Sequence, residues 1–198
     1  MDYSINQGCP DLGLMTWLGF HGYTRISELA DIRRTGYVPQ PRGQGLRTFA
    51  TVILSTTKAG RAQSFEVLNE GLDYAMQQYI SSRTRPGRSL ARPDHLFDHT
   101  SAQYREWLTA ACKECGLHSV HLSPHSLRGG GATADQLRGV EKKEIQARGR
   151  WESERTCGLY LQSARVLTES ITISLALKQL GLALYDQGNM GHMFWGVF

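Results

Sequence analysis

The stretch SPHSLRGGGATADQLRGVEKKEIQARGRWESERTCGLYLQ, residues 123–162, is the most informative part of this sequence. Its pattern predicts three helices, over residues 124–138, 141–148 and 153–164. Ser153 is the expected N-cap of the last helix. His125 and Arg128 are three residues apart and would share one face of the first helix. The glycines at 129–131 imply that this helix is either loosely held or packed closely against a neighbour.

The residues before this stretch form helical patterns separated by loops and one β-rich region. Apolar residues at helical spacing predict helices over 11–32 (two short ones, or one broken at Gly22), 66–82 and 101–115. The runs LRTFATVILS (46–55) and SFEVL (64–68) flank a polar turn and predict an antiparallel hairpin. Pro and Gly predict loops over 33–45 and 81–93. The expected fold class is α+β, mainly α-helical with a small antiparallel β-sheet and no βαβ alternation.

Length and composition are those of one globular domain. The chain has 198 residues, of which 40% are hydrophobic and 20% charged. It holds no run of 18 apolar residues, so we expect no membrane partner, and MDYSINQGCPDLG lacks the basic start of a signal peptide. Four cysteines are too few for a disulfide scaffold and suit a reducing, intracellular compartment.

The charge distribution indicates an anionic partner. The net charge is +4, and residues 25–92 hold 11 Lys or Arg against 5 Asp or Glu, whereas residues 93–198 balance at 11 against 11. Arginine outnumbers lysine 17 to 5, and its planar fork suits phosphate. The first half is therefore either a nucleic-acid face or a solvated surface rich in arginine. In the loop 81–93 the predicted DNA-backbone contacts are Arg83, Arg85, Arg88 and Arg92.

The spacing in the C-terminal half resembles that of the tyrosine recombinases, the phage-integrase family. Arg128 precedes Trp151 by 23 residues, and Trp151 precedes Tyr160 by nine. In that family an H-x-x-R helix start is followed by a glycine paired with His or Trp, and then by the nucleophilic tyrosine. Here the pair is Arg150-Trp151 after Gly149, so the glycine stands one place early.

The N-terminal half is similar to the same family. GYTRISELADI (22–32) resembles its first-arginine segment, which implies that Arg25 is a catalytic arginine supported by Glu28. TKAGRAQSFEV (57–67) resembles the hairpin of the catalytic lysine, and Lys58 is the only lysine in the first 112 residues. The resemblance spans roughly residues 12–165 and implies the catalytic-core fold of the DNA breaking-rejoining enzymes.

The resemblance implies metal-free cleavage and rejoining of DNA strands, with no cofactor and no ATP. Tyr160 would attack the scissile phosphate and hold a 3′-phosphotyrosyl intermediate. Arg25 and Arg128 would stabilise the charge on the non-bridging oxygens.

The remaining implied roles concern protons and packing. His125 would donate a hydrogen bond to the phosphate or accept the tyrosine proton. Lys58 would protonate the leaving 5′ oxygen. Trp151 would supply one N–H donor and pack against the tyrosine helix.

The resemblance also implies a domain organisation and partners. Residues 1–165 would form the catalytic domain, and residues 166–198 a C-terminal helix and apolar tail that either docks on a neighbouring protomer or covers its own core. The family's N-terminal core-binding domain is expected to be absent from this chain. The expected partners are double-stranded DNA and further copies of the chain, as a tetramer on two DNA sites. The expected location is intracellular and DNA-associated, in a prokaryotic nucleoid or cytoplasm or a eukaryotic nucleus.

Two other functions remain open, and one metal site is disfavoured. A type IB topoisomerase would share the chemistry but relax supercoils, and a catalytically silent DNA-binding remnant of a mobile element would lack it. Cys112 and Cys115, followed by His118 and His121, contain zinc-ligand types. Their spacing does not fit a zinc finger, so no metal is expected.

The general-acid role of Lys58 predicts a substrate-dependent defect. Lys58→Ala should slow cleavage of ordinary DNA by about 10²–10⁴-fold, because the leaving alkoxide then lacks its proton donor. A substrate with sulfur at the bridging 5′ position should be cleaved at a nearly normal rate, since a thiolate leaves without protonation. Single-turnover rates on both substrates check this. Equal slowing on both would make Lys58 a phosphate contact, with His125 the next candidate donor.

Overall fold

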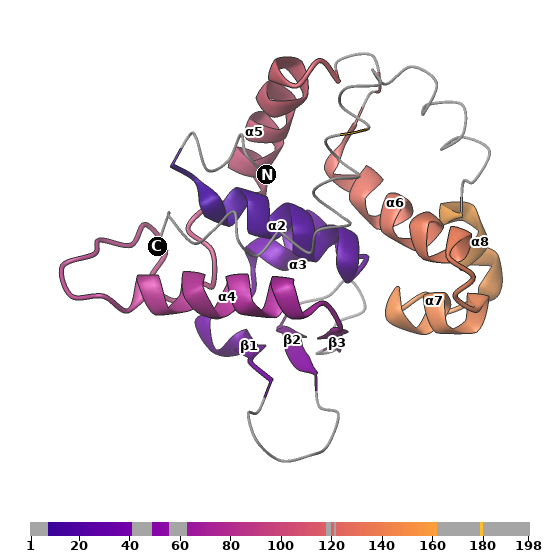
Figure 1. Ribbon diagram of the computed structural model, residues 1–198, viewed down its shortest axis with the longest axis horizontal. Helices are drawn as coiled ribbons and strands as arrows, with labels where there is room; N and C mark the ends of the chain where they lie inside the picture. Colours follow the sequence, from indigo (N-terminus) through magenta and orange to yellow (C-terminus); the bar gives the residue numbers. More distant parts are fainter. Residues whose placement is uncertain are drawn as a thin grey trace.

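The computed structural model describes residues 8–40, 49–55, 63–117, 120, 122–161 and 179. Its helices are α2 (Pro10–His21), α3 (Ile26–Ala30), α4 (Glu70–Arg83), α5 (Ser101–Glu114), α6 (Pro124–Leu137), α7 (Lys142–Arg148) and α8 (Glu154–Tyr160) (Figure 1). A 3-10 turn, Arg34–Gly36, precedes β1 (Tyr37–Val38), β2 (Ala50–Leu54) and β3 (Gln63–Val67). The described part is mainly helical with one small antiparallel sheet in the order β1-β2-β3, as expected. No helix within it is long and apolar enough to cross a membrane.

The predicted hairpin is confirmed, but the sheet has a strand that the sequence did not indicate. β2 and β3 pair antiparallel, with Val52 opposite Phe65. The loop prediction for 33–45 is wrong at Tyr37 and Val38, which pair with β2. A strand of two residues has no periodicity of its own, and it forms here because β2 presents a free edge.

Both ends of α8 are set by side-chain hydrogen bonds. Ser153 is the N-cap, as predicted, and its Oγ accepts a hydrogen bond from the backbone N–H of Thr156 at 3.1 Å. The predicted end at residue 164 is wrong, because the helix stops at Tyr160 and Leu161 is extended. The Tyr160 carbonyl accepts a hydrogen bond from Thr133 Oγ1 of α6 at 3.2 Å, so a tertiary donor takes the place of a further helical turn.

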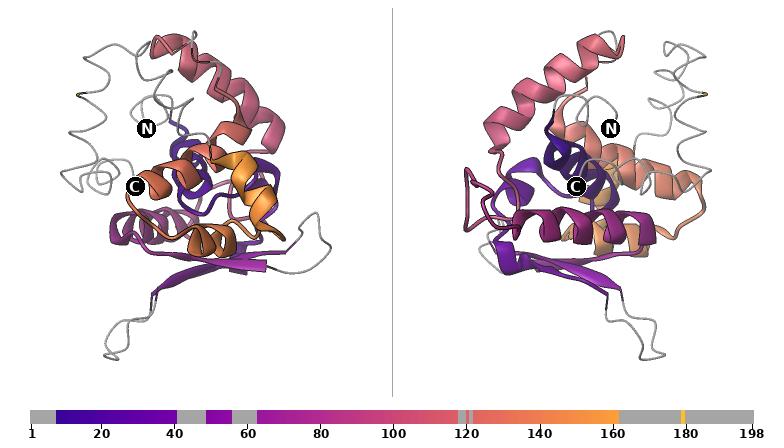
Figure 2. Two further views of the ribbon diagram at one scale, coloured as in Figure 1. Left: turned by 90° about the vertical axis from the view of Figure 1, so that its right-hand side faces the viewer. Right: turned by 60° about the vertical axis from the view of Figure 1, so that its left-hand side comes forward.

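The main core lies between the sheet and the helices. Figure 2 shows the sheet at one end of the described molecule, with the described helices on one side of it. α2 lies at the centre and contacts α3, α4 and α6. Its residues Leu14, Met15 and Leu18 are completely buried. This explains why α2, although only 12 residues long, is a stable part of the fold.

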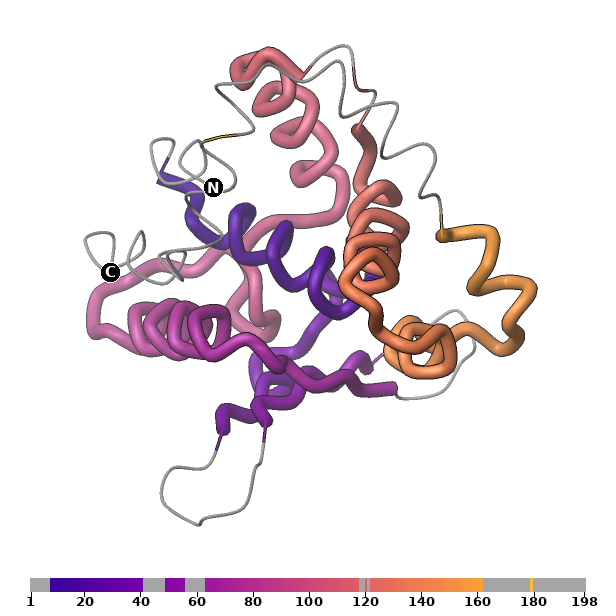
Figure 3. The backbone as a smooth tube through the Cα atoms, turned by 45° about the vertical axis from the view of Figure 1, so that its right-hand side comes forward, coloured from indigo at the N-terminus to yellow at the C-terminus, as the bar shows by residue number. Residues whose placement is uncertain are grey.

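A second, smaller core holds the C-terminal helices together. It consists of Tyr23, Ala132, Ile145, Trp151 and Cys157, which come from the turn after α2, from α6 and α7, from the segment between α7 and α8, and from α8. Figure 3 shows α6, α7 and α8 grouped beside α2. Because Tyr23 follows directly from α2, this small core is attached to the large one through the α2–α3 turn.

The glycines of α6 allow a close approach between α6 and the end of α2. A Cβ atom on Gly131 would stand 2.0 Å from the carbonyl oxygen of Phe20, and one on Gly130 would stand 3.4 Å from the Phe20 ring. Of the two interpretations of residues 129–131, close packing is therefore correct.

This close approach predicts the effect of adding one methyl group. Gly131→Ala should lower the free energy of unfolding by about 1–3 kcal/mol, because the Cβ overlaps a backbone oxygen that cannot rotate away. Gly158→Ala is the matched control, since a Cβ there meets nothing within 4 Å of the described residues and a helical alanine is favoured by about 0.5–1 kcal/mol. Urea unfolding of both variants measures this, and an unchanged midpoint for Gly131→Ala would contradict the close packing.

Candidate active site

The centre of the candidate site is the guanidinium of Arg128. Arg128 projects from the first turns of α6 and is only 2% exposed. Its Nη1 donates a hydrogen bond to the carbonyl of Tyr23, and its Nη2 donates one to the carbonyl of Gly149 at 2.6 Å. One side chain thereby connects the α2–α3 turn, α6 and the segment before α8.

Aromatic rings surround this guanidinium. Its Cζ lies 4.6 Å from the ring centroid of Trp151 and 5.4 Å from that of Tyr160. The Tyr160 ring lies 4.9 Å from Trp151 and 5.2 Å from the His125 ring, between centroids. Tyr160 therefore contacts the three other residues His125, Arg128 and Trp151 that the resemblance names in this half of the chain, although 35 positions separate His125 from Tyr160.

Arg25 and Glu28 form the pair that the sequence predicted. Arg25 is the N-cap of α3, and Glu28 is the third residue of that helix. Arg25 Nη1 lies 2.7 Å from Glu28 Oε1, and the Arg25 backbone N–H donates to Oε2 at 3.0 Å. Glu28 is 5% exposed, whereas the Arg25 side chain is 37% exposed. A buried carboxylate thus holds a guanidinium whose other side is open to solvent.

Arg150 completes the site and was missed as a functional residue. Its Nη2 lies 3.6 Å from Glu28 Oε2, and its side chain is 9% exposed. The sequence contained one sign of it, because Gly149 stands one place earlier than in the family pattern and an arginine follows it. Spacing alone could not show where the side chain of that arginine points.

The electrostatic balance of the site is positive. Arg25 and Arg150 form ion pairs with Glu28, and Arg128 lies within electrostatic range of the same carboxylate, so three positive charges against one leave +2. Burial lowers the pKa of Arg128, and the charge of Arg25 lowers it further. Burial also lowers the pKa of Arg150 to about 10. Desolvation and the charges of Arg128 and Arg25 lower the pKa of His125, which favours its neutral imidazole at neutral pH.

Two buried N–H groups beside Tyr160 are unused within the described residues. Arg128 Nε and Trp151 Nε1 are both inaccessible to solvent and have no acceptor in this part of the chain. A buried donor without an acceptor costs about 1–3 kcal/mol. A ligand with acceptor oxygens would remove that cost.

The basic loop after α4 does not form the surface that the sequence predicted. Arg83 is buried and forms an ion pair with Asp98 at 2.5 Å, so it is not available to DNA. Arg92 is half-buried and donates from Nη1 to the carbonyls of Ala30 and His99. Arg85 and Arg88 are exposed. The prediction for Arg83 is wrong because arginine also satisfies buried carbonyls and carboxylates, which composition cannot reveal, whereas that for Arg92 stays a prediction.

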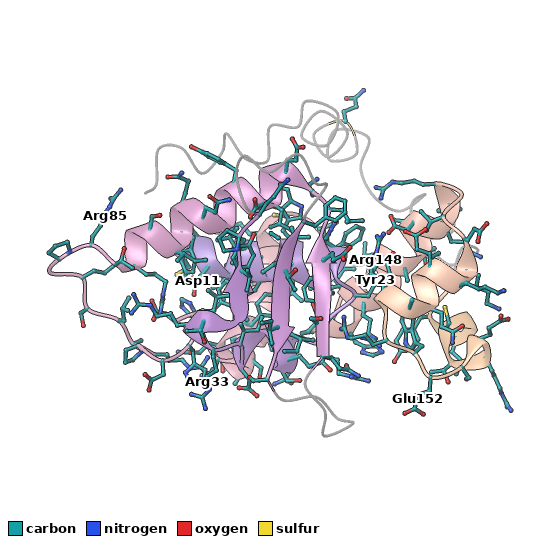
Figure 4. All side chains as sticks on the ribbon, turned by 90° about the horizontal axis from the view of Figure 1, so that it is seen from below. Asp11, Tyr23, Arg33, Arg85, Arg148 and Glu152 are labelled. Atoms are coloured by element: carbon teal, nitrogen blue, oxygen red, sulfur yellow. The ribbon has the colours of Figure 1, made fainter. Side chains whose placement is uncertain are left out.

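The position of this loop separates it from the site. Figure 4 labels Arg85 at one end of the molecule, and Tyr23 and Arg148 where the sheet region meets α6–α8. Lys58 lies outside the described residues, as do His118, His121 and Tyr185. Within the described part, no three His, Cys, Asp or Glu side chains are grouped in a way that would hold a metal ion.

Comparisons with known proteins add no assignment. No family, curated protein or solved structure matches the chain. The function must therefore be argued from the geometry and charge of these residues.

The buried bonds of Arg128 predict a stability effect apart from any activity. Arg128→Lys should lower the free energy of unfolding by about 1–3 kcal/mol, because one ammonium cannot reach both carbonyls and one is left without a donor. Arg25→Lys, at an exposed ion pair, should cost less than about 1 kcal/mol. Urea unfolding compares the two, and equal midpoints would contradict the bridging role of Arg128.

Proposed function

We propose that this chain is the catalytic domain of a DNA strand-breaking and rejoining enzyme of the tyrosine recombinase type. The observation that carries the proposal is the contact of Tyr160 with Arg128, Trp151 and His125. A tyrosine beside a buried guanidinium and a neutral imidazole has the neighbours that a phenolic nucleophile for phosphodiesters needs. The small sheet and the surrounding helices are compatible with the catalytic core of that family.

The charge of the site supports a phosphodiester as its ligand. The net charge of +2 is confined to Arg25, Arg128, Arg150 and Glu28. A phosphodiester carries one negative charge, and its pentacovalent transition state carries two. The site is therefore better matched to the transition state than to the ground state, which is the condition for catalysis.

The donors of the site have distinct roles in this proposal. Arginine has five N–H groups, and Arg128 uses two of them on protein carbonyls. The buried Nε and the other hydrogens of Nη1 and Nη2 are left for the non-bridging oxygens. Trp151 Nε1 offers a further donor, and the open side of Arg25 offers a second guanidinium.

The proton of the tyrosine is assigned to His125. Because the pKa of His125 is lowered, its imidazole is neutral and accepts the phenolic proton as Tyr160 attacks. The phosphodiester bond is replaced by a 3′-phosphotyrosyl bond, and the 5′ oxygen leaves with a proton from Lys58. Reversal of these steps rejoins the strand without ATP.

The proposed partners are double-stranded DNA and further copies of this chain. Site-specific recombination or integration requires four active sites on two DNA sites, so a tetramer belongs to the proposal. The arginine-rich surface would bind the phosphate backbone and place the protein on DNA in the cell. The exposed Arg85 and Arg88 and the half-buried Arg92 are the members of the 81–93 loop that remain in this role.

The nucleophile assignment is tested by Tyr160→Phe. The variant should fold and bind DNA as the wild type does, because only the phenolic oxygen is removed, and it should form no covalent adduct. The substrates are nicked suicide duplexes of randomised sequence, so that no target site has to be known. Adducts are detected as protein bands shifted on a denaturing gel.

Tyr74→Phe, on α4, is the matched control and should form adduct at the wild-type rate. Adduct with Tyr160→Phe would move the nucleophile elsewhere, with Tyr185 the next candidate. The absence of adduct from the wild type would favour the silent DNA-binding remnant. Relaxation of supercoiled plasmid, without strand exchange or a preferred site, would favour the type IB topoisomerase.

A further inference from the structure

The backbone at Arg150 is in a conformation that favours glycine. Its φ is +55°, in the left-handed region, where an L side chain is strained. Gly116 and Gly139 occupy comparable left-handed positions elsewhere in the chain, at +68° and +86°. Residue 150 is an arginine, although Gly149 stands one place earlier. A strained backbone conformation at a residue with a long charged side chain points to a use of that side chain.

The side chain of Arg150 is fixed in the interior by several contacts. Its Nη1 donates to the carbonyls of Gly22 at 3.2 Å and Arg148 at 3.1 Å. Its guanidinium lies over the Phe65 ring, 5.5 Å from Cζ to centroid. These contacts direct the charged end of Arg150 toward α3, where Glu28 lies.

Glu28 is shared by two arginines. Its Oε1 lies 2.7 Å from Arg25 Nη1, whereas its Oε2 accepts a hydrogen bond from the Arg25 backbone N–H at 3.0 Å and lies 3.6 Å from Arg150 Nη2, an ion pair without a hydrogen bond. Because Glu28 is buried, its two oxygens depend on these partners in place of water, and Arg150 is the partner that comes from outside the α3 capping box. The orientation of Glu28 in turn determines where the long side chain of Arg25 is held.

We infer that Arg150 is a positioning residue for Arg25, acting through Glu28. This inference rests on the proposed function. Arg150 places a second positive charge beside Oε2, in addition to the Arg25 backbone N–H, and thereby helps to hold the carboxylate that orients the Arg25 guanidinium. It also takes a share of the carboxylate's charge, and Arg25 therefore keeps positive charge for the phosphate.

The test replaces Arg150 in two backgrounds, one with Glu28 and one with Glu28→Gln. Arg150→Gly removes the guanidinium and suits the left-handed backbone. Its single-turnover cleavage rate should fall about 10- to 100-fold, as is typical when a group that holds a site residue is removed. The DNA dissociation constant and its salt dependence should stay within about twofold, because Arg150 itself does not touch DNA. On a Glu28→Gln background the same change should cost less than about threefold, since the pathway through Glu28 is already lost.

Further variants keep the result interpretable. Arg150→Lys retains the charge opposite Glu28, and it should recover at least part of the rate that Arg150→Gly loses. Arg105→Ala removes an exposed guanidinium from α5 and should leave the rate unchanged. Urea midpoints show whether each variant folds. If Arg150→Gly does not fold, the cleavage rate of Arg150→Lys, measured with and without Glu28→Gln, shows whether residue 150 acts through Glu28.

Several outcomes would overturn the inference. A normal rate for Arg150→Gly, or equal losses with and without Glu28→Gln, would show that Arg150 does not act through Glu28. A weaker DNA affinity with a shallower salt dependence would make Arg150 a direct phosphate contact. A wild type that forms no adduct would remove the proposed function and the inference with it, whereas a wild type that forms adduct at the same rate as Arg150→Gly would remove only the inference.

Discussion

The bond between the Arg128 guanidinium and two backbone carbonyls is the interaction on which the arrangement of the site depends. The carbonyls belong to Tyr23 and Gly149, which are 126 residues apart in sequence. The large core joins α2–α5 and the sheet, and the small core joins the α2–α3 turn to α6–α8. Arg128 connects the two where they meet, and Trp151 and Tyr160 cover its guanidinium. The position of the tyrosine is therefore a consequence of how one buried charge is satisfied.

A close approach of backbones is the second requirement. Arg128 reaches the Tyr23 carbonyl only because α6 crosses the end of α2 without a side chain at Gly131 between them. The carbonyl itself is aimed by a left-handed turn at Tyr23, whose φ is +46°. The strained backbone conformations of Tyr23 and Arg150 therefore lie in the segments that Arg128 joins by its hydrogen bonds. This is typical of sites in which stability has been exchanged for a fixed geometry.

The same region concentrates positive charge in the protein interior. Burial of a guanidinium is unfavourable unless carbonyls, a carboxylate or aromatic faces replace water. Arg128 donates hydrogen bonds to carbonyls and lies over aromatic rings, whereas Arg25 and Arg150 both form ion pairs with one carboxylate, Glu28. The compensation leaves an excess of positive charge and, among the described residues of this region, three buried N–H groups without a hydrogen-bond acceptor: Arg128 Nε, Arg150 Nη2 and Trp151 Nε1. An anion is the ligand that would remove both deficits at once.

Local pattern alone determined the helices, the β2–β3 hairpin and the Ser153 cap, because helical period and strand alternation are local properties. The candidates His125, Arg128, Trp151 and Tyr160 came from the resemblance of their order and spacing to one family. Tertiary structure alone decided the strand at Tyr37, the end of α8 at Tyr160, the burial of Arg83 and the place of Arg150. Each of these depends on a partner distant in sequence: β2, Thr133, Asp98 and Glu28 respectively. An arginine in a sequence is a charge with many reachable partners, and only the folded chain selects among a phosphate, a carboxylate and a buried carbonyl.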